Sequence, residues 1–401
     1  MSEVFAEPEG DAPAGLAVYR RSSSPYERWM EEEGIPVVRG IGVRDTREVE
    51  LGPWRRRNAR GAFLHLRGVE AVKGMYVIEV PEGDATTPEK HMYDEFFLVV
   101  EGRGTTEVWR GDGPKQVFEW QPGSLFMIPI NASYRLVNAT GARALLLAAN
   151  NAPPVMNIYQ SHAFVFENDW DWDERGPLGD QFFAPKGDVE KDPVRKRAAI
   201  RSNLFPDVVR CELPLDNQRA PGYRRIQPLW NGFVQDATTG GFVAQYPTGR
   251  YSKAHFHESG AVLVCLRGEG YTLNWPVELG PTPWADGHAD KVNRVDYVPG
   301  GLVAAAPGGG GWFHQHFGVG EEPLRILNYW GGPYGKWGTA DRGEAGEKVK
   351  AGNLFGIKDG GRTILYHEED PYVRSYFRER LAEVGVDFTM PDELFAPPAA
   401  P

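Results

Sequence analysis

The sequence predicts an all-β protein made of two tandem β-barrels or β-sandwiches, with a few helices at the margins. Three observations predict this fold class. The chain has 48 glycines and 32 prolines among 401 residues, a composition that favours turns between short strands. Short apolar stretches that suit strands alternate with Gly and Pro punctuation. One unit of this kind also occurs twice in the chain.

The repeat is visible as residues that match at a constant offset of 166 positions. Gly83 matches Gly249, and the glycines, a threonine and the tryptophan of Val99–Trp109 match those of Cys265–Trp275. A duplicated unit is the simplest explanation. The chain then divides into an N-terminal extension with a helix (1–59), a first barrel (60–150), a connector that packs on the barrels (151–224), a second barrel (225–332) and a C-terminal extension with a helix (333–401).

The elements follow from local signals. Ser24-Pro25-Tyr26-Glu27 is a capping box with Pro at the first helical position, and Gly34 ends that helix. In the first unit we expect strands over 74–80, 96–100, 105–109 and 125–128, which turn residues separate. Near the end of the chain, Asp370-Pro371 opens a second helix that runs to Gly385.

The bulk composition excludes several classes of protein. A net charge of −11 and a pI near 5.4 argue against nucleic acid as a partner. No apolar stretch is long enough for a membrane span, and no signal peptide is visible. Cys211 and Cys265 are too few for a disulfide framework, so we expect a reducing, cytoplasmic location.

Four of the nine histidines fall in two H-x-H steps, His255-Phe256-His257 and His314-Gln315-His316. Alternate residues of a strand point the same way, so both histidines of a step share one face. Two such strands can bring several imidazoles to one point, and imidazole suits Fe, Cu, Ni and Zn. The second unit is therefore predicted to bind a transition metal.

These residues resemble the cupin superfamily, whose first motif is G-x5-H-x-H-x3/4-E-x6-G. The second unit fits it from Gly249 to Gly268, with Ala261 in place of the Glu, and the His of the second family motif corresponds to His314. The first unit follows it from Gly83 to Gly102 with Glu89 in place of the first His, and Tyr134 stands where the second motif has its His. The resemblance implies that each unit is a jelly-roll barrel. The whole chain looks like a bicupin, and it is similar to an uncharacterised bacterial group. The three histidines and the missing Glu resemble gentisate-type ring-cleaving dioxygenases.

Bicupins often pair through edge strands and terminal segments, so we expect a homo-oligomer.

The resemblance implies a non-haem Fe(II) dioxygenase that uses O2 and a small hydroxylated or carboxylated, aromatic substrate, without an organic cofactor. The expected metal ligands are His255, His257 and His314, with His316 as an alternative third ligand or a nearby hydrogen-bond donor. Mn, Ni, Zn and Cu are the alternative ions. The alternative functions are an O2-independent decarboxylase or isomerase, and a non-catalytic binding protein.

Neighbouring residues are assigned to the substrate from their position in the sequence. Arg250, Arg325 and Gln315 are candidates to bind a substrate carboxylate, and Gln315, Arg250 and His316 to act in catalysis. Tyr251 and Trp312 are candidates to wall the pocket.

The corresponding residues of the first unit are Glu89, His91, Glu95 and Tyr134. They could form an oxygen-rich site that suits Mn. We favour a vestigial site in which this polar cluster is hydrogen-bonded or solvated. Alternatively, Lys90 and Arg135 neutralise the carboxylates. The run Arg55-Arg56-Arg57 is interpreted as solvated surface.

Overall fold

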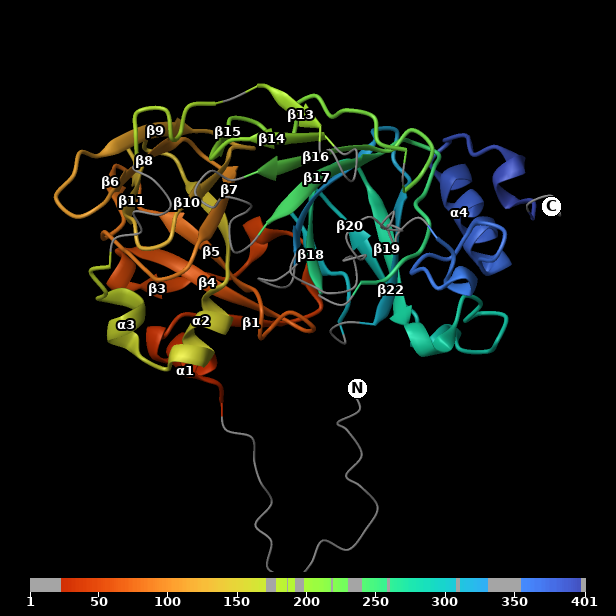
Figure 1. Cartoon of the computed structure of the whole chain (residues 1–401), viewed down its shortest axis with the longest axis horizontal. Helices are drawn as coiled ribbons and strands as arrows, with labels where there is room; N and C mark the ends of the chain where they lie inside the picture. Colours follow the sequence, from red (N-terminus) through yellow and green to blue (C-terminus); the bar gives the residue numbers. More distant parts are fainter. Residues whose placement is uncertain are drawn as a thin grey trace, which may run out of the picture.

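A computed structural model describes residues 23–170, 178–185, 187–191, 198–217, 219–229, 240–257, 260–307, 311–330 and 355–397. The described chain is mostly β-strand, with helices at its margins, so the predicted fold class is confirmed. Two barrels lie side by side, and α4 lies at the far side of the second (Figure 1).

Each barrel combines a large sheet and a small sheet. The large sheet of the first barrel has the order β1-β4-β5-β12-β7-β10-β15, with β3 beside β4, and its small sheet has the order β6-β11-β8-β9. These strands are β1 (Val37–Gly40), β3 (Gly52–Trp54), β4 (Ala59–Leu66), β5 (Gly74–Val80), β6 (Asp84–Ala85), β7 (Glu95–Glu101), β8 (Gly104–Trp109), β9 (Gln116–Trp120), β10 (Leu125–Ile128), β11 (Ser133–Asn138), β12 (Ala144–Asn150) and β15 (Leu204–Phe205).

The second barrel repeats this arrangement. Its large sheet has the order β13-β14-β16-β17-β23-β18-β21-β2, and its small sheet has the order β20-β19-β22. These strands are β2 (Gly42–Val43), β13 (Val189–Lys191), β14 (Ala198–Arg201), β16 (Arg224–Leu229), β17 (Gly241–Tyr246), β18 (Ala261–Arg267), β19 (Gly270–Pro276), β20 (Asn293–Tyr297), β21 (Leu302–Ala304), β22 (Trp312–Gly318) and β23 (Leu324–Trp330).

The duplication extends to details of register. The order β5-β12-β7-β10 in the first barrel corresponds to β17-β23-β18-β21 in the second. The β12–β7 pairing skips Val100, and the β18–β23 pairing skips Leu266, which lies 166 positions later. A β-bulge therefore occurs at the same place in both copies.

Helices cap the two ends of the molecule. They are α1 (Pro25–Glu33), α2 (Ala152–Tyr159), α3 (His162–Phe166) and α4 (Pro371–Glu383), with short 3-10 helices at Thr46–Glu48, Arg55–Arg57, Val277–Leu279, Ala289–Lys291, Ile357–Asp359 and Asp392–Phe395. The predicted capping box at Ser24 is present, and Gly34 ends α1 in the left-handed conformation. Asp370 caps α4, which ends at Glu383, two residues before the predicted end. None of the described helices is long and apolar enough to cross a membrane.

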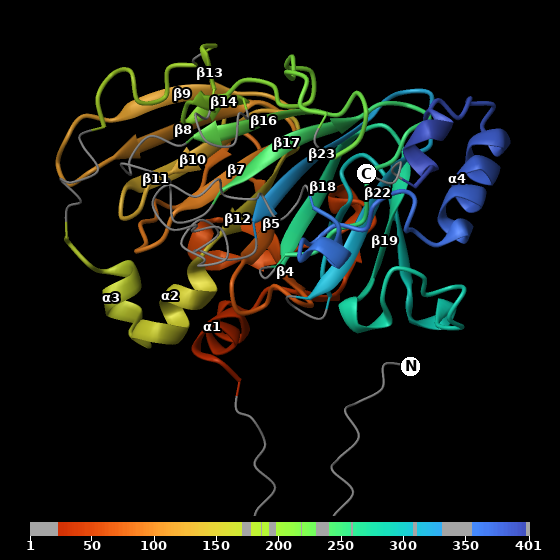
Figure 2. The same cartoon turned by 45° about the vertical axis from the view of Figure 1, so that its right-hand side comes forward.

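The two large sheets pack against each other through one apolar cluster (Figure 2). Figure 2 shows the strands of the two sheets next to each other. The cluster contains Val77, Leu98 and Leu147 of the first barrel together with Val264 and Leu327 of the second. Strands from outside the repeats tie the barrels together further, because β2 pairs with β21 and β15 pairs with β10. The N-terminal extension thus adds a strand to the second barrel, and the connector adds one to the first.

We expect Leu327→Ala to destabilise both barrels at once, because Leu327 is buried in the shared cluster. Truncation of a buried Leu to Ala costs about 2–5 kcal/mol. Urea unfolding followed by tryptophan fluorescence should show one transition at a lower midpoint. Val117→Ala, at an exposed position of β9, should leave the midpoint unchanged. Two separate transitions, only one of them shifted, would contradict a shared core.

Candidate metal centre

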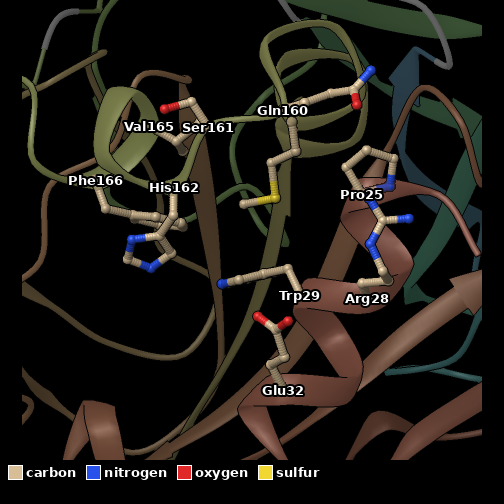
Figure 3. A pocket seen from close by; sticks show the side chains of 10 residues that line it. Pro25, Arg28, Trp29, Glu32, Gln160, Ser161, His162, Val165 and Phe166 are labelled. Carbon is tan, nitrogen blue, oxygen red and sulfur yellow. The ribbon is translucent and has the colours of Figure 1, made fainter.

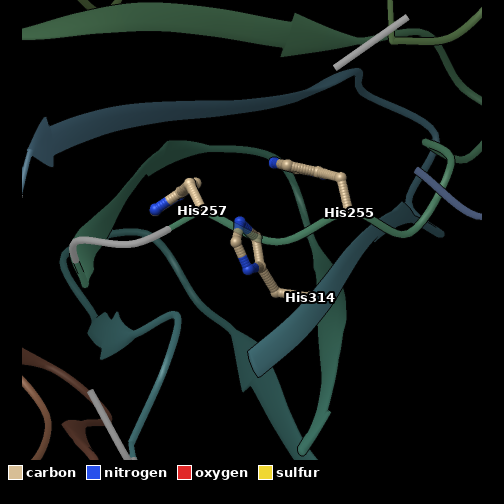
Figure 4. Close-up of side chains that lie close together, drawn as sticks. All are labelled: His255, His257 and His314. Carbon is tan, nitrogen blue, oxygen red and sulfur yellow. The ribbon is translucent and has the colours of Figure 1, made fainter. Parts of the chain in front are cut away.

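Three histidines converge in the second barrel. His255 and His257 lie on the segment between β17 and β18, and His314 lies on β22 (Figure 4). The His255 N–H donates to the His314 carbonyl at 3.1 Å, and the His314 N–H donates back at 2.9 Å. Residues paired in this way share a face. One possible ligand atom from each of the three histidines lies within 4.8 Å of the other two.

Backbone carbonyls orient two of the imidazoles. His255 Nδ1 lies 3.4 Å from the carbonyl of Lys253, and His314 Nδ1 lies 3.2 Å from that of Trp312. An Nδ1–H that donates to a carbonyl leaves Nε2 unprotonated and able to bind a metal. This is the usual arrangement around metal-ligating histidines.

Burial keeps these imidazoles neutral. It lowers the pKa of His255 well below its ordinary value, and the charge of Arg219 lowers that pKa further. Burial also lowers the pKa of His314, with His257 as the next cause. Neutral imidazole is the form that binds a metal, so the residues present fit a divalent transition ion.

His316 shares a face of β22 with His314 but has another partner. Its Nδ1 lies 3.0 Å from the Tyr297 hydroxyl, and burial lowers its pKa to about 3. The His316 ring centroid lies 5.6 Å from that of His314, compared with 4.2 Å between His255 and His314. Of the two candidates for third ligand, His314 belongs to the converging group, and His316 lies beside it.

Gln315 and Tyr251 lie on the other side of β22. Gln315 Nε2 donates to the Ser252 carbonyl at 2.9 Å and to Glu369 at 3.3 Å. The Tyr251 hydroxyl donates to the same Glu369, and its ring stacks on Phe317. Gln315 alternates with His314 and His316 along β22, and Tyr251 lies opposite Phe317, so both side chains point toward Glu369 of the C-terminal extension and away from the face that carries His314. Trp312, in contrast, supports the cluster through its carbonyl.

Neither predicted carboxylate-binding arginine is brought to the histidines. Arg325 donates to the carbonyls of Val208, Val209 and Cys211 and to the Gln245 side chain, so it holds the connector against β23. Arg250 donates to the Pro221 carbonyl and to the Thr389 hydroxyl. Both guanidinium groups fasten peripheral segments, which sequence proximity to a motif does not reveal.

Two groups at the cluster were missed by the sequence reasoning. Arg219, in the connector, lies beside the segment that carries His255 and His257, because its carbonyl accepts a hydrogen bond from Lys253 N at 3.2 Å. Asn274, on β19, is paired with His314 and fully buried. Both amide atoms of Asn274 lack a hydrogen-bond partner among the described residues, and a buried group left so costs about 1–3 kcal/mol. No motif marks either residue, although the constant offset of the repeat could have identified Asn274 by comparison with Val108.

The polar residues of the first barrel are bonded to one another and to arginines. The Tyr134 hydroxyl donates to Glu95 at 2.5 Å, and His91 Nε2 lies 3.2 Å from the same carboxylate. Burial would raise the pKa of Glu95, but the hydrogen bond and charge of His91 and the charge of Arg57 lower it to about 2. Arg57 also pairs with Glu89 at 2.6 Å.

Two expectations about the charges around this site are corrected. Arg57 is buried rather than part of a solvated run, and Arg56 reaches Glu89 at 2.9 Å. Lys90 pairs with Asp169 and Arg135 with Glu107 instead of with the buried carboxylates. Within the described residues, the converging group of three metal-binding side chains is that of the second barrel.

A separate pocket lies between α1, α2 and α3 (Figure 3). Trp29, Glu32, Gln160 and His162 are among its lining residues. It belongs to the N-terminal extension and the connector, and the three converging histidines are not part of its lining.

Comparison with known proteins finds one family match, in the first barrel, and a set of similar solved structures. The family model of the cupin domain matches residues 76–150, which lie in the first barrel. No curated protein matches the sequence. Among solved structures, the oxalate decarboxylase of Lactobacillus farciminis in a formate complex superposes with a TM-score of 0.45 at 11% identity, over 73% of this chain and 86% of that chain.

Structures of the Bacillus subtilis oxalate decarboxylase are similar at the same level. A mutant of that enzyme gives a TM-score of 0.45 at 10% identity, over 74% of this chain and 78% of that chain. A structure described with its Mn(II) centres gives 0.44 at 12% identity, with the same coverage.

We expect Arg57→Met to destabilise the protein by about 1.5–3 kcal/mol, because the buried Glu89 carboxylate then loses its buried charged partner and keeps only Arg56. Adding Glu89→Gln should restore most of the loss. Arg55→Met, at an exposed position of the same 3-10 helix, is the control. Equal losses for Arg55→Met and Arg57→Met in urea unfolding would contradict a buried ion pair.

Glu369 should make stability depend on pH. Burial raises the pKa of Glu369 from an ordinary value of 4.5 to about 8, and the charge of Asp370 contributes to the rise. Hydrogen bonds from Tyr251 and Gln315 and the charge of Arg374 lower this pKa, but their effect is smaller. Between these pH values the folded state retains a proton that the unfolded state releases, so stability falls as pH rises from about 4.5 to 8.

We expect Glu369→Gln to flatten this part of the profile, measured as the free energy of unfolding in urea from pH 5 to 8.5. Glu379→Gln, at an exposed position of α4, should keep the slope of the unmodified protein. A slope unchanged in Glu369→Gln would show that other groups cause it.

Proposed function

We propose that the chain is a metal-dependent oxidoreductase that binds Fe(II) through His255, His257 and His314. We infer that it acts as a dioxygenase on a small hydroxylated or carboxylated, aromatic substrate. The observation that supports this most strongly is the convergence of three imidazoles, whose possible ligand atoms lie within 4.8 Å of one another. Burial keeps two of them, His255 and His314, neutral by lowering the pKa of each. When bound, the ion supplies a Lewis acid with open coordination positions.

The surroundings of the histidines support an open site. Ala261, at the position of the motif Glu, is a buried residue at the start of β18 and cannot supply a fourth ligand. Three protein ligands leave room for substrate, as in non-haem iron oxygenases with a facial triad. A neutral ligand set also leaves the charge of a divalent ion uncompensated, and Arg219 adds a further positive charge nearby. Both features favour an anionic oxygen ligand.

We expect protein purified without oxygen to hold about one iron per chain and to consume O2 when a gentisate-like substrate is added. His255→Ala, His257→Ala and His314→Ala should each weaken metal binding by more than about 100-fold, since even the loss of a group that orients a ligand costs 10- to 100-fold. Elemental analysis and an oxygen electrode measure both effects. His162→Ala, at an exposed histidine of α3, is the matched control and should retain metal.

The alternatives give different results in the same experiment. Bound manganese without O2 uptake would favour a decarboxylase or isomerase. Protein free of metal after gentle purification would favour a non-catalytic binding protein. Retention of metal by all three histidine variants would contradict the proposed ligands.

A further inference from the structure

An arginine occupies corresponding places in the two barrels. In the first barrel the carbonyl of Arg57 accepts from Thr87 N at 2.9 Å, and in the second the carbonyl of Arg219 accepts from Lys253 N at 3.2 Å. Thr87 and Lys253 are separated by 166 positions, the offset of the repeat. Arg57 and Arg219 are therefore structural counterparts, although they lie outside the matched sequence segments.

The carboxylates that balance this arginine are present in the first barrel only. Arg57 pairs with Glu89 at 2.6 Å, and Glu95 lies close by. At the same offset the second barrel has His255 and Ala261. The second barrel thus contains the arginine but neither of the two glutamates. Nη1 of Arg219 is buried and has no hydrogen-bond partner among the residues that the structure describes.

Asn274 on β19 is a second buried polar side chain without a hydrogen-bond partner among the described residues. His314 pairs with His255 on one side and with Asn274 on the other, so the three side chains form a row on one face of the sheet. In the first barrel the corresponding row is Glu89, Tyr134 and Val108. Val108 is apolar and needs no partner, whereas the amide of Asn274 is fully buried with both polar atoms unpartnered within the described chain. Buried polar groups are rarely left so, which indicates that a bound molecule completes the site.

We propose that the second barrel binds a small carboxylate, whose anionic group pairs with Arg219 and whose oxygen atoms hydrogen-bond to Asn274. The ligand supplies from outside the negative charge that Glu89 and Glu95 supply inside the first barrel. This proposal rests on the proposed function, because the same ligand chelates the ion held by the three histidines. It narrows the substrate class to carboxylates and excludes diols without a carboxylate, such as catechol, as the preferred ligand.

The test uses the full-length protein loaded with Co(II), whose visible absorption reports ligands that reach the metal. Salicylate and catechol are the probes, because both chelate but only salicylate has a carboxylate. We expect Arg219→Gln to weaken salicylate binding by about 10- to 100-fold, the range for a hydrogen bond to a charged group. Catechol binding should change less than about 3-fold, since no charge pair is lost. Arg210→Gln, at an exposed arginine of the connector, is the matched control.

Two further variants use the repeat itself. Asn274→Val introduces the residue of the first barrel and should weaken salicylate binding while leaving the Co(II) spectrum of the free protein unchanged. Ala261→Glu restores an internal carboxylate at the position of Glu95 and should block salicylate. Thermal unfolding of each metal-free variant shows whether it folds.

The outcomes separate this inference from the metal proposal. If Arg219→Gln weakens the binding of salicylate and catechol equally, or weakens neither, the carboxylate site is overturned. If the Co(II) band also disappears in His255→Ala, the proposal that the histidines bind the metal still stands. A wild-type protein that gives no Co(II) band would overturn both.

Discussion

The pair of reciprocal backbone hydrogen bonds between His255 and His314 is the constraint on which the candidate site depends. It places two imidazoles opposite each other on one face, whatever their side chains prefer. Strand alternation then determines the rest of β22, with His314 and His316 turned to one side and Gln315 to the other. Carbonyls of Lys253 and Trp312 fix the rings from behind. The backbone pairing of His255 with His314 therefore sets the geometry of the candidate metal site.

The interiors of the two barrels have the same strand arrangement but carry different charges. The first contains acids, and arginines from a 3-10 helix outside the repeat neutralise them, so its interior is a closed ion-pair network. The second contains buried neutral imidazoles and a buried amide, together with Arg219, whose Nη1 has no hydrogen-bond partner among the described residues. An anion can therefore pair with Arg219 in the second barrel, whereas the acids of the first barrel already occupy its arginines.

Segments outside the repeats complete both barrels. Arg57 comes from the N-terminal extension and Arg219 from the connector, and Arg325 holds the connector in place through three backbone carbonyls. The C-terminal extension covers the outer face of the small sheet of the second barrel, where Phe377 and Leu381 of α4 pack beside Phe313 and Phe317. The histidines thus lie on one face of β22 and an apolar core on the other, which holds the strand rigidly.

The sequence by itself determined the fold class, the duplication, the capped helices and the face shared by each pair of histidines. These features follow from spacing, because alternation, turn residues and the offset of a repeat are local properties of the chain. Tertiary structure alone decided which charges meet. Arg250 and Arg325 lie near the motifs in sequence but bind carbonyls elsewhere, whereas Arg219 and Arg57 lie far from them and reach the barrel interiors. A long, flexible side chain can reach partners from any neighbouring segment, so its contacts depend on how distant segments pack.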